Sequence, residues 1–414
     1  MRFERWVRVA GGAAMLCAVS IVPAGAPAAA DSIRDHQWAL SSLDAEAMTK
    51  VSTGRGVTVA VVDTGVDGTH PDLKGSVLSG KNFIMDHGRA DRETESSHGT
   101  GMASLIAGHG HGPGDTAGIK GLAPAVKILP LRATTDDNMA VGKVGRGGPV
   151  AQAIRYAADH GASVINLSMG SPDDPALEEA VRYARQKDVV MVAAAGNDGA
   201  GTPNFPANYP GVISVGAVDS SDKIWHMSNY GSHTLLSAPG VGTYNAGLDH
   251  EYQVGDGTSG ATAFVSATAA LLRAKFPDLT AGQIANRLVK TAKLPTSVKG
   301  AKLPDKHYGY GVIRPYRALT QDIPPGSKNG PLSASSASPS AAPESSDSAD
   351  PDAPSHKGRL AFVVWGVVGV MVLGLLAVVT VVVVKRRRRV VPPPPLPPIP
   401  PQFRQQPPGP DVRQ

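Results

Sequence analysis

Residues 255–265 carry the sequence Gly-Asp-Gly-Thr-Ser-Gly-Ala-Thr-Ala-Phe-Val, in which a serine follows two glycines and opens a helical pattern. Small and apolar side chains recur after it at helical spacing, at Ala261, Val265, Thr268, Ala269 and Leu272. This spacing predicts a buried helix with Ser259 in its first turn. There the hydroxyl and the backbone N–H would stand at the positive end of the helix dipole, which stabilises a developing oxyanion. Taken alone, a Gly-Thr-Ser before a helix is more often an ordinary N-cap.

An aspartate, a histidine and an asparagine upstream give this serine a chemical context. Asp63 ends an apolar, β-branched run, and His98 stands just before a second helical pattern of small residues. The chain order Asp, His, Ser is that of the subtilisin-type catalytic triad. Asn197 follows the apolar run 192–195, and a side-chain amide in that place is a suitable donor to an oxyanion.

With these four segments the chain resembles the subtilisin-like serine proteases, or subtilases, over roughly residues 34–320. The resemblance implies that Ser259 attacks the scissile carbonyl and that His98 acts as the general base. It also implies that Asp63 holds the imidazole in the useful tautomer and that Asn197 donates to the oxyanion beside the backbone N–H of the serine.

The same resemblance places the substrate. Ser168, Met169 and Gly170 match the family segment that lines the cleft and pairs with the substrate backbone, and Gly196 would leave room for the residue whose bond is cut. The implied substrate is an extended polypeptide. One difference from the family pattern is that Gly260 takes the place of a larger residue, which is expected to loosen the start of the helix.

Strand-like and helical patterns alternate along the middle of the chain. Strands are expected at 57–62, 126–131, 163–167, 189–194 and 212–218, and helices at 99–108, 150–160 and 176–187. The alternation predicts an α/β fold, and with the family resemblance a subtilisin-like three-layer fold with a central, mostly parallel sheet. Residues 108–114 and 134–148 are rich in glycine and are interpreted as exposed loops.

The net charge of +5 is concentrated at the two ends of the chain. Residues 1–30 carry +2 and residues 358–414 carry +7, which leaves −4 for the stretch between them. No basic face is therefore implied, and no nucleic acid is predicted as a partner. His109 and His111 would need a third ligand to hold a metal, so a solvated loop is the preferred interpretation, and neither a metal nor a cofactor is predicted.

The two ends of the chain indicate export and a membrane anchor. Residues 1–30 have the basic start, apolar middle and small-residue end of a signal peptide. The protease domain is predicted over 31–320, and a disordered tether rich in Ser, Ala and Pro over 321–357. Residues 360–384 form an uncharged apolar run, long enough for one transmembrane helix across a hydrocarbon core of ~30 Å.

A basic cluster follows this run and opens the remaining segment, 385–414. By the positive-inside rule this segment is a cytoplasmic tail, which predicts a single-pass cell-membrane protein with an extracellular catalytic domain. The tail is rich in proline and fits either a docking segment or a spacer. Near the other end, residues 31–55 are too few to fold alone, and their apolar side chains predict packing on the protease domain rather than removal as a pro-segment.

This order of segments resembles that of the mycosins, the membrane-anchored proteases of type VII secretion in actinobacteria. The likeness implies membrane proteins of a secretion complex as partners, beside the polypeptide substrate and the membrane itself. Two functions remain open. One is a surface endopeptidase that cleaves exported or cell-envelope proteins, and the other is a structural component of a membrane secretion complex whose proteolytic activity is dispensable. The physiological substrate and the cleavage motif do not follow from the sequence.

Overall fold

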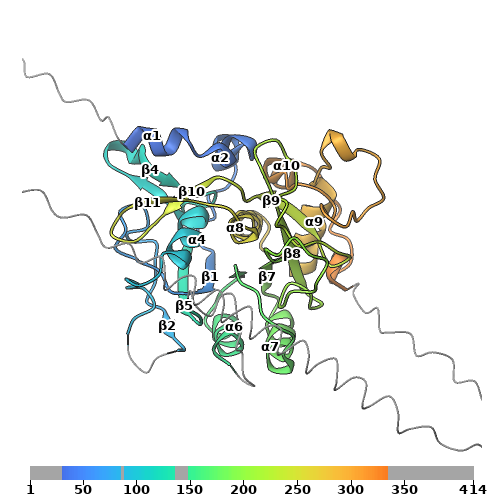
Figure 1. The fold of residues 1–414 in the computed structure, drawn as a ribbon, viewed down its shortest axis with the longest axis horizontal. Helices are drawn as coiled ribbons and strands as arrows, with labels where there is room; N and C mark the ends of the chain where they lie inside the picture. The colour runs from blue at the N-terminus through green and yellow to red at the C-terminus, as the bar shows by residue number, and fades with distance from the viewer. Residues whose placement is uncertain (1–29, 85–87, 136–147, 334–414) are drawn as a thin grey trace, which may run out of the picture. The chain divides into compact units, whose positions relative to one another are not determined.

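The computed structural model describes residues 30–84, 88–135 and 148–333, which fold around a seven-stranded sheet (Figure 1). The strand order is β2-β5-β1-β6-β7-β8-β9, and each neighbouring pair is parallel. The strands of this sheet are β1 (Thr58–Asp63), β2 (Lys81–Asn82), β5 (Lys127–Arg132), β6 (Val164–Leu167), β7 (Val190–Ala194), β8 (Val212–Val218) and β9 (Leu236–Pro239). Two antiparallel hairpins stand apart from it, formed by β3 (His109–His111) with β4 (Ala117–Lys120) and by β10 (Thr243–Ala246) with β11 (Tyr252–Gly255).

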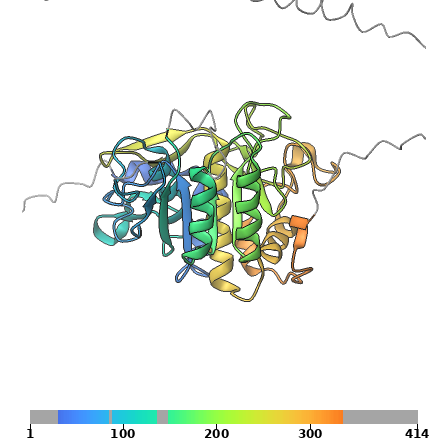
Figure 2. The ribbon, with the colours of Figure 1, turned by 90° about the horizontal axis from the view of Figure 1, so that it is seen from below.

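Helices cover both faces of the sheet. On one face α6 and α7 lie side by side, as Figure 2 shows, and on the other α8 is surrounded by α4, α9 and the strands. The helices are α1 (Ala30–Asp35), α2 (Trp38–Ser42), α3 (Ala45–Thr49), α4 (His98–Ala107), α6 (Pro149–Asp159), α7 (Pro175–Gln186), α8 (Thr258–Lys275), α9 (Ala281–Thr291) and α10 (Pro315–Thr320). The predicted α/β fold with a parallel sheet between helix layers is confirmed.

Alternate side chains of each central strand enter different cores. In β1, Val59 and Val61 belong to the core under α4 and α8, whereas Ala60 and Val62 belong to the core under α6 and α7. The period of two in a strand produces this division, and burial on both faces explains why the run is apolar throughout. The two cores therefore share the central strands as a common wall.

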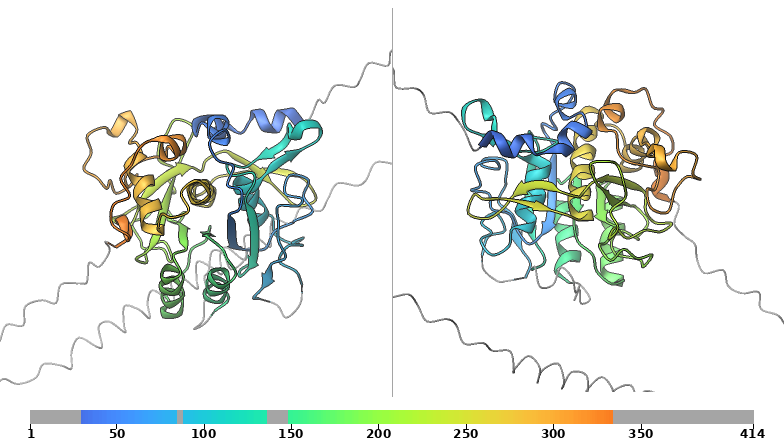
Figure 3. Two further views of the ribbon diagram at one scale, coloured as in Figure 1. Left: turned by 180° about the vertical axis from the view of Figure 1, so that it is seen from behind. Right: turned by 45° about the horizontal axis from the view of Figure 1, so that its top comes forward.

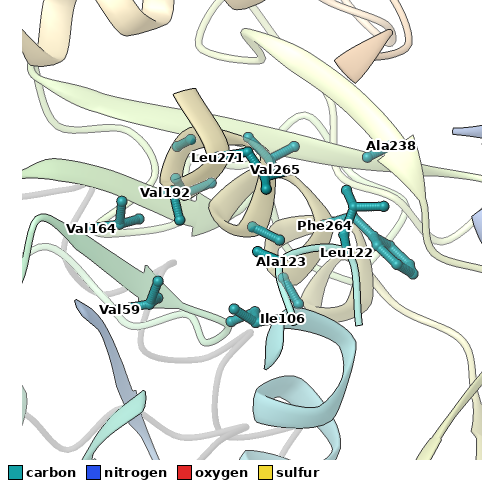
Figure 4. Close-up of a cluster of buried hydrophobic side chains, with 14 of the residues drawn as sticks. Val59, Ile106, Leu122, Ala123, Val164, Val192, Ala238, Phe264, Val265 and Leu271 are labelled. Carbon is teal, nitrogen blue, oxygen red and sulfur yellow. The ribbon is translucent and has the colours of Figure 1, made fainter. Parts of the chain in front are cut away.

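Helix α8 is buried almost all round. Its buried residues are Thr258, Gly260, Ala261, Thr262, Ala263, Phe264, Val265, Ser266, Ala267, Thr268, Ala269, Ala270, Leu271 and Leu272. Figure 4 shows Phe264, Val265 and Leu271 among side chains from α4 and from the strands. A helix that is buried on every side has little freedom to tilt.

The segment after the predicted signal peptide packs on the protease domain as expected. We call residues 33–51 the N-terminal strap. Its Leu43 and Met48 are fully buried, and Trp38 donates from Nε1 to the carbonyl oxygens of Val241 and Gly242, at 3.1 and 3.2 Å. Figure 3 shows its helices, in blue, beside the β10–β11 hairpin.

Several expectations differ from the structure or fall outside it. Residues 108–114 were expected to form a loop, but they contain β3, and the small strands β9 to β11 were not predicted. Residues 321–333 were predicted to belong to the tether, but this segment contacts the protease domain. Arg287 donates to the carbonyl oxygens of Gln321 and Ile323, at 2.6 and 3.2 Å. Most of the predicted loop 134–148 lies outside the described residues.

The predicted signal peptide, the transmembrane helix over 360–384 and the tail over 385–414 also lie outside the described residues. Within the described ranges, no helix has the length and apolar character that a membrane crossing requires.

Candidate active site

Asp63 and His98 form a hydrogen-bonded pair at the carboxyl edge of the sheet. Asp63 is the last residue of β1 and is fully buried, and its Oδ1 accepts from the backbone N of Thr64 and from Nδ1 of His98, both at 2.8 Å. His98 opens α4 and exposes 23% of its side chain. A neutral imidazole that donates from Nδ1 to a carboxylate carries its lone pair on Nε2, and this is the form that accepts a proton.

Two glycines and a hydroxyl fix the approach of α4 to β1. A Cβ on Gly99 would lie 2.0 Å from the carbonyl oxygen of Gly65 and 3.2 Å from Cβ of Asp63, so only glycine fits. The backbone N of Gly99 donates to Oγ1 of Thr64 at 3.1 Å. These contacts hold the residue after His98 directly against the strand end that carries Asp63.

A buried ion pair, which was not predicted, supports the segment that leads into α4. Oε1 of Glu93 accepts from the backbone N atoms of Thr94, Glu95 and Ser96, at 3.1, 2.7 and 3.2 Å. Its Oε2 lies 2.9 Å from Nη1 of Arg132, which ends β5 and is paired in register with Asp63. The sequence feature that could have indicated this ion pair is a charged residue at the end of a strand next to β1. Strand order cannot be read from the sequence, so the ion pair was not predicted.

Ser259 lies in the first turn of α8, as predicted, and α8 packs against α4. Its Oγ donates to the carbonyl oxygen of Ser168 at 3.1 Å. Gly260 does not interrupt the helix, which runs unbroken from Thr258 to Lys275. A Cβ on Gly260 would lie 3.2 Å from Oγ1 of Thr243, so the glycine lets β10 approach the helix closely.

The amide of Asn197 is oriented by Thr258, the residue before the serine. Oδ1 of Asn197 accepts from the backbone N of Thr258 at 3.0 Å and from its Oγ1 at 2.8 Å. These two bonds fix the acceptor end of the amide and leave Nδ2 as its donor end. This use of Thr258 was not predicted, because a hydroxyl beside a serine gives no signal of its own partner.

The predicted substrate-binding residues follow β6 and β7, which are neighbours in the sheet. Gly170 and Gly196 are packed so closely that side chains would clash: a Cβ on Gly170 would lie 2.1 Å from Oδ1 of Asn204, and one on Gly196 2.3 Å from Nδ2 of Asn229. Met169 exposes only 7% of its surface and packs in the core under α6 and α7. Asn204, which was not predicted, lies against Gly170 and donates from Nδ2 to the carbonyl oxygen of Ala194 at 3.0 Å.

The two histidines considered as a metal pair have other partners. Nδ1 of His111 lies 2.6 Å from Oδ1 of Asp72, whose Oδ2 accepts from the backbone N of Ile119 at 2.7 Å. The ring of His109 lies within hydrogen-bond distance of the carbonyl oxygens of Gly110 and Lys74, at 2.7 and 3.1 Å. Among the described residues, no group of His, Cys, Asp and Glu side chains has an arrangement that could hold a metal ion.

The carboxylate of Asp72 has two further ring neighbours. His70 is fully buried, and its ring packs edge-on against that of Tyr252 at 5.6 Å between centroids. Burial lowers the pKa of His70 below its ordinary value, although Asp72 opposes this shift. Burial, together with the charge of Asp72, raises the pKa of Tyr252.

Comparisons with known proteins show the family and its relatives. The model of the subtilase family, Peptidase S8, matches residues 54–311. The thermophilic serine proteinase of Bacillus sp. (strain AK1) is 39% identical over 274 residues, which are 66% of this chain and 63% of that relative.

Two solved structures have similar folds. MycP1 from Mycobacterium smegmatis is 32% identical with a TM-score of 0.61, over 71% of this chain and 87% of that one. The MycP3 protease, described as part of the type VII (ESX-3) secretion system, is 31% identical with a TM-score of 0.58, over 69% of this chain and 88% of that one.

Proposed function

Because the chain belongs to the subtilase family and is a serine endopeptidase, we propose that Asp63, His98 and Ser259 form its catalytic triad. Oγ of Ser259 attacks the scissile carbonyl while Nε2 of His98 takes the hydroxyl proton. The C–N bond then breaks as His98 returns that proton to the departing amine, and water hydrolyses the acyl-enzyme by the same route. Asp63 holds the tautomer and stabilises the imidazolium.

The observation that carries this proposal is the 2.8 Å hydrogen bond between Nδ1 of His98 and the fully buried carboxylate of Asp63. A buried carboxylate beside an imidazole favours the protonated ring, which is the state that forms in the transition state. The pair lies at the start of α4, which packs against the helix whose first turn holds Ser259.

Asn197 and the cleft complete the proposed site. With Oδ1 of Asn197 bound by Thr258, Nδ2 is available to donate to the tetrahedral oxyanion beside the backbone N–H of Ser259. The segment from Ser168 to Gly170 would pair with an extended substrate backbone, and Gly196, whose missing side chain lets Asn229 approach, would lie beside the bond to be cut.

A serine-directed fluorophosphonate tests the assignment. We expect the purified protein to be labelled at Ser259 alone, as identified by mass spectrometry of its peptides, and the folded Ser259→Ala variant to take up no label. Replacement of the exposed Ser221 by alanine is the matched control and should leave labelling unchanged. Label that persists in a folded Ser259→Ala protein would contradict the proposed nucleophile.

We further propose that the protease is anchored in the cell membrane by residues 360–384, with its catalytic domain outside and its tail inside. The apolar run and the basic cluster after it support this orientation, and the similarity to MycP1 and MycP3 supports a place in type VII secretion. External protease added to intact cells should release a soluble catalytic domain by cutting within 321–357. Release of the proline-rich tail instead would overturn the orientation.

A role as a structural component of a secretion complex is favoured by the likeness to MycP3, which is described as part of such a system. The two roles separate in cells that lack the gene. If Ser259→Ala protein restores secretion there, the structural role is the essential one. If only the unaltered protein restores it, proteolysis is essential.

A further inference from the structure

A chain of buried hydrogen bonds joins β6 to α8 beneath the proposed nucleophile. We infer that Asn166 is a positioning residue for Ser259 that acts through the hydroxyl of Ser168. This inference rests on the proposed function of Ser259. We call the side chains of Asn166, Ser168 and Ser266 the polar seam, and each of them is fully buried.

Asn166 lies in the middle of the sheet, where a polar side chain is costly. In β6 it pairs with Val61 of β1 on one side and with Val192 of β7 on the other. A buried amide destabilises the fold unless its donor and acceptor are both used. A strand formed only to fill the core would carry an apolar residue here, as its neighbours Val61 and Val192 do.

Asn166 is connected to α8 at two points, directly to Ser266 and through Ser168 to Ser259. Oγ of Ser266 donates to Oδ1 of Asn166 at 3.0 Å, and Nδ2 of Asn166 donates to Oγ of Ser168 at 2.9 Å. Oγ of Ser168 then donates to the carbonyl oxygen of Ser259 at 2.9 Å. Each hydroxyl has one proton to donate, so the chain runs in one direction, from Ser266 to the main chain of the nucleophile.

Ser168 and Ser259 are bound to each other twice. The hydroxyl of Ser168 donates to the carbonyl oxygen of Ser259, and the hydroxyl of Ser259 donates to the carbonyl oxygen of Ser168 at 3.1 Å. Asn166 orients the first of these bonds because its amide occupies one lone pair of the Ser168 hydroxyl. The position of the attacking oxygen is therefore coupled to an amide in the sheet that is not itself part of the proposed triad.

The spacing of the seam fixes the helix along its axis. Ser259 and Ser266 are seven residues apart, which is about two turns or roughly 10 Å on one face of a helix. Apolar packing is not directional, so on its own it restricts the sliding and the rotation of α8 less sharply than hydrogen bonds do. Hydrogen bonds at two points along α8 remove both freedoms, and a displacement of about 1 Å at a reacting atom costs on the order of 10²-fold in rate.

The test measures the second-order rate of fluorophosphonate labelling together with kcat and KM on a peptide substrate. Asn166→Ala and Ser168→Ala are expected to lower the labelling rate and kcat by about 10-fold to 100-fold. KM should stay within about twofold if uniform substrate binding is retained. All rates are taken per folded protein, well below each variant's melting temperature.

Thr268→Val is the matched control. Its hydroxyl is equally buried on α8 but donates within the helix, to the carbonyl oxygen of Phe264 at 2.8 Å. We expect this variant to lose stability while its labelling rate stays within about twofold of the unaltered protein. An equal loss of labelling in Thr268→Val and Asn166→Ala would overturn the inference, since the effect would then follow stability alone.

The double variant Asn166→Ala with Ser168→Ala tests the route. If Asn166 acts through Ser168, the double variant labels as slowly as Ser168→Ala and no slower. Losses that multiply would show independent action and would overturn the inference. If Asn166→Ala does not fold, Ser266→Ala replaces it in both measurements, and an unchanged labelling rate in that variant would equally overturn the inference.

Failure of this inference differs from failure of the proposed function. If the unaltered protein takes up no label at Ser259, the proposed nucleophile is wrong. If the unaltered protein is labelled there and the Asn166 variants are labelled at the same rate, only the positioning role is wrong.

Discussion

The molecule contains two pairs of aspartate and histidine that have nearly the same local geometry. Nδ1 of His98 lies 2.8 Å from Asp63, and Nδ1 of His111 lies 2.6 Å from Asp72. Both carboxylates are fully buried, while the two imidazoles expose 23% and 35% of their side chains. Distance and burial alone therefore do not distinguish a catalytic pair from a structural one.

The surroundings of the two pairs differ. Asp63 ends a central strand, and His98 opens a helix that packs on α8, the helix of Ser259. Asp72 instead accepts from the backbone N of Ile119 in β4, and His111 lies in the hairpin that β4 forms with β3. The first pair has the proposed nucleophile on the neighbouring helix, whereas the second joins a hairpin to the body of the domain.

The largest expected effect comes from making the same change in both pairs. Asp63→Asn should lower kcat by about 10⁴-fold, the size of loss known for triad proteases, subtilisin among them. Asp72→Asn should leave kcat within a few-fold and lower the free energy of unfolding by about 1–3 kcal/mol, because a buried hydrogen-bonded carboxylate is lost. Steady-state kinetics and denaturant titration of both variants measure these effects. Comparable losses of kcat in the two variants would abolish the distinction between the pairs.

A smaller effect is expected at the proposed oxyanion donor. Asn197→Ala should lower kcat by about 10²–10³-fold, a value known from subtilisin itself, and should also lower the melting temperature, because Thr258 loses the acceptor of two hydrogen bonds. Asn286→Ala, which removes a half-buried amide that donates to the carbonyl oxygens of Pro324 and Pro325, is the control and should leave kcat unchanged. An unaltered kcat in Asn197→Ala would assign the oxyanion to another donor.

The smallest effect on activity is expected near the second pair, where pH should act on stability. The pKa of His70 is lowered by burial from its ordinary value of 6.5, so between the two values the unfolded chain binds more protons than the folded one. The contribution of this group to stability is therefore complete above about pH 6.5 and is lost as the pH falls below it.

Melting temperatures between pH 8 and pH 5 measure this dependence. The slope should become shallower in His70→Gln and stay the same in His226→Gln, which alters an exposed histidine. Some slope should remain in His70→Gln, since burial also lowers the pKa of His233 and of His307. A slope in His70→Gln as steep as in the unaltered protein would show that His70 does not contribute to it.

The sequence predicted those features that depend on neighbours along the chain. Asp63 and Ser259 could be placed because an apolar β-branched run predicts a strand and an unbroken small-residue pattern predicts a buried helix. The large sheet followed from the alternation of such runs. The loosening expected from the glycine between Ser259 and Ala261 stays a prediction, whereas its close approach to Thr243 depends on a distant strand and could not be predicted.

What could not be predicted depends on contacts between distant segments. Asp72 and His111 are 39 residues apart, and no local pattern indicates that they meet. In the sequence, Asn166 is a single polar residue within a predicted strand. Its hydrogen-bonding partner Ser266 lies 100 residues further along the chain. Strand order and register determine which distant residues come into contact, and neither can be read directly from the sequence.

The contacts of the N-terminal strap determine when it can dock during synthesis as well as where it lies. Trp38 binds carbonyl oxygens that lie 203 and 204 residues further along the chain, so the strap is made early and cannot complete its contacts until that part exists. At roughly 5–20 residues per second of synthesis, this delay is about 10–40 s. Closing so long a loop also costs entropy before any contact compensates for it. The first described segment to be synthesised is therefore expected to be among the last to dock.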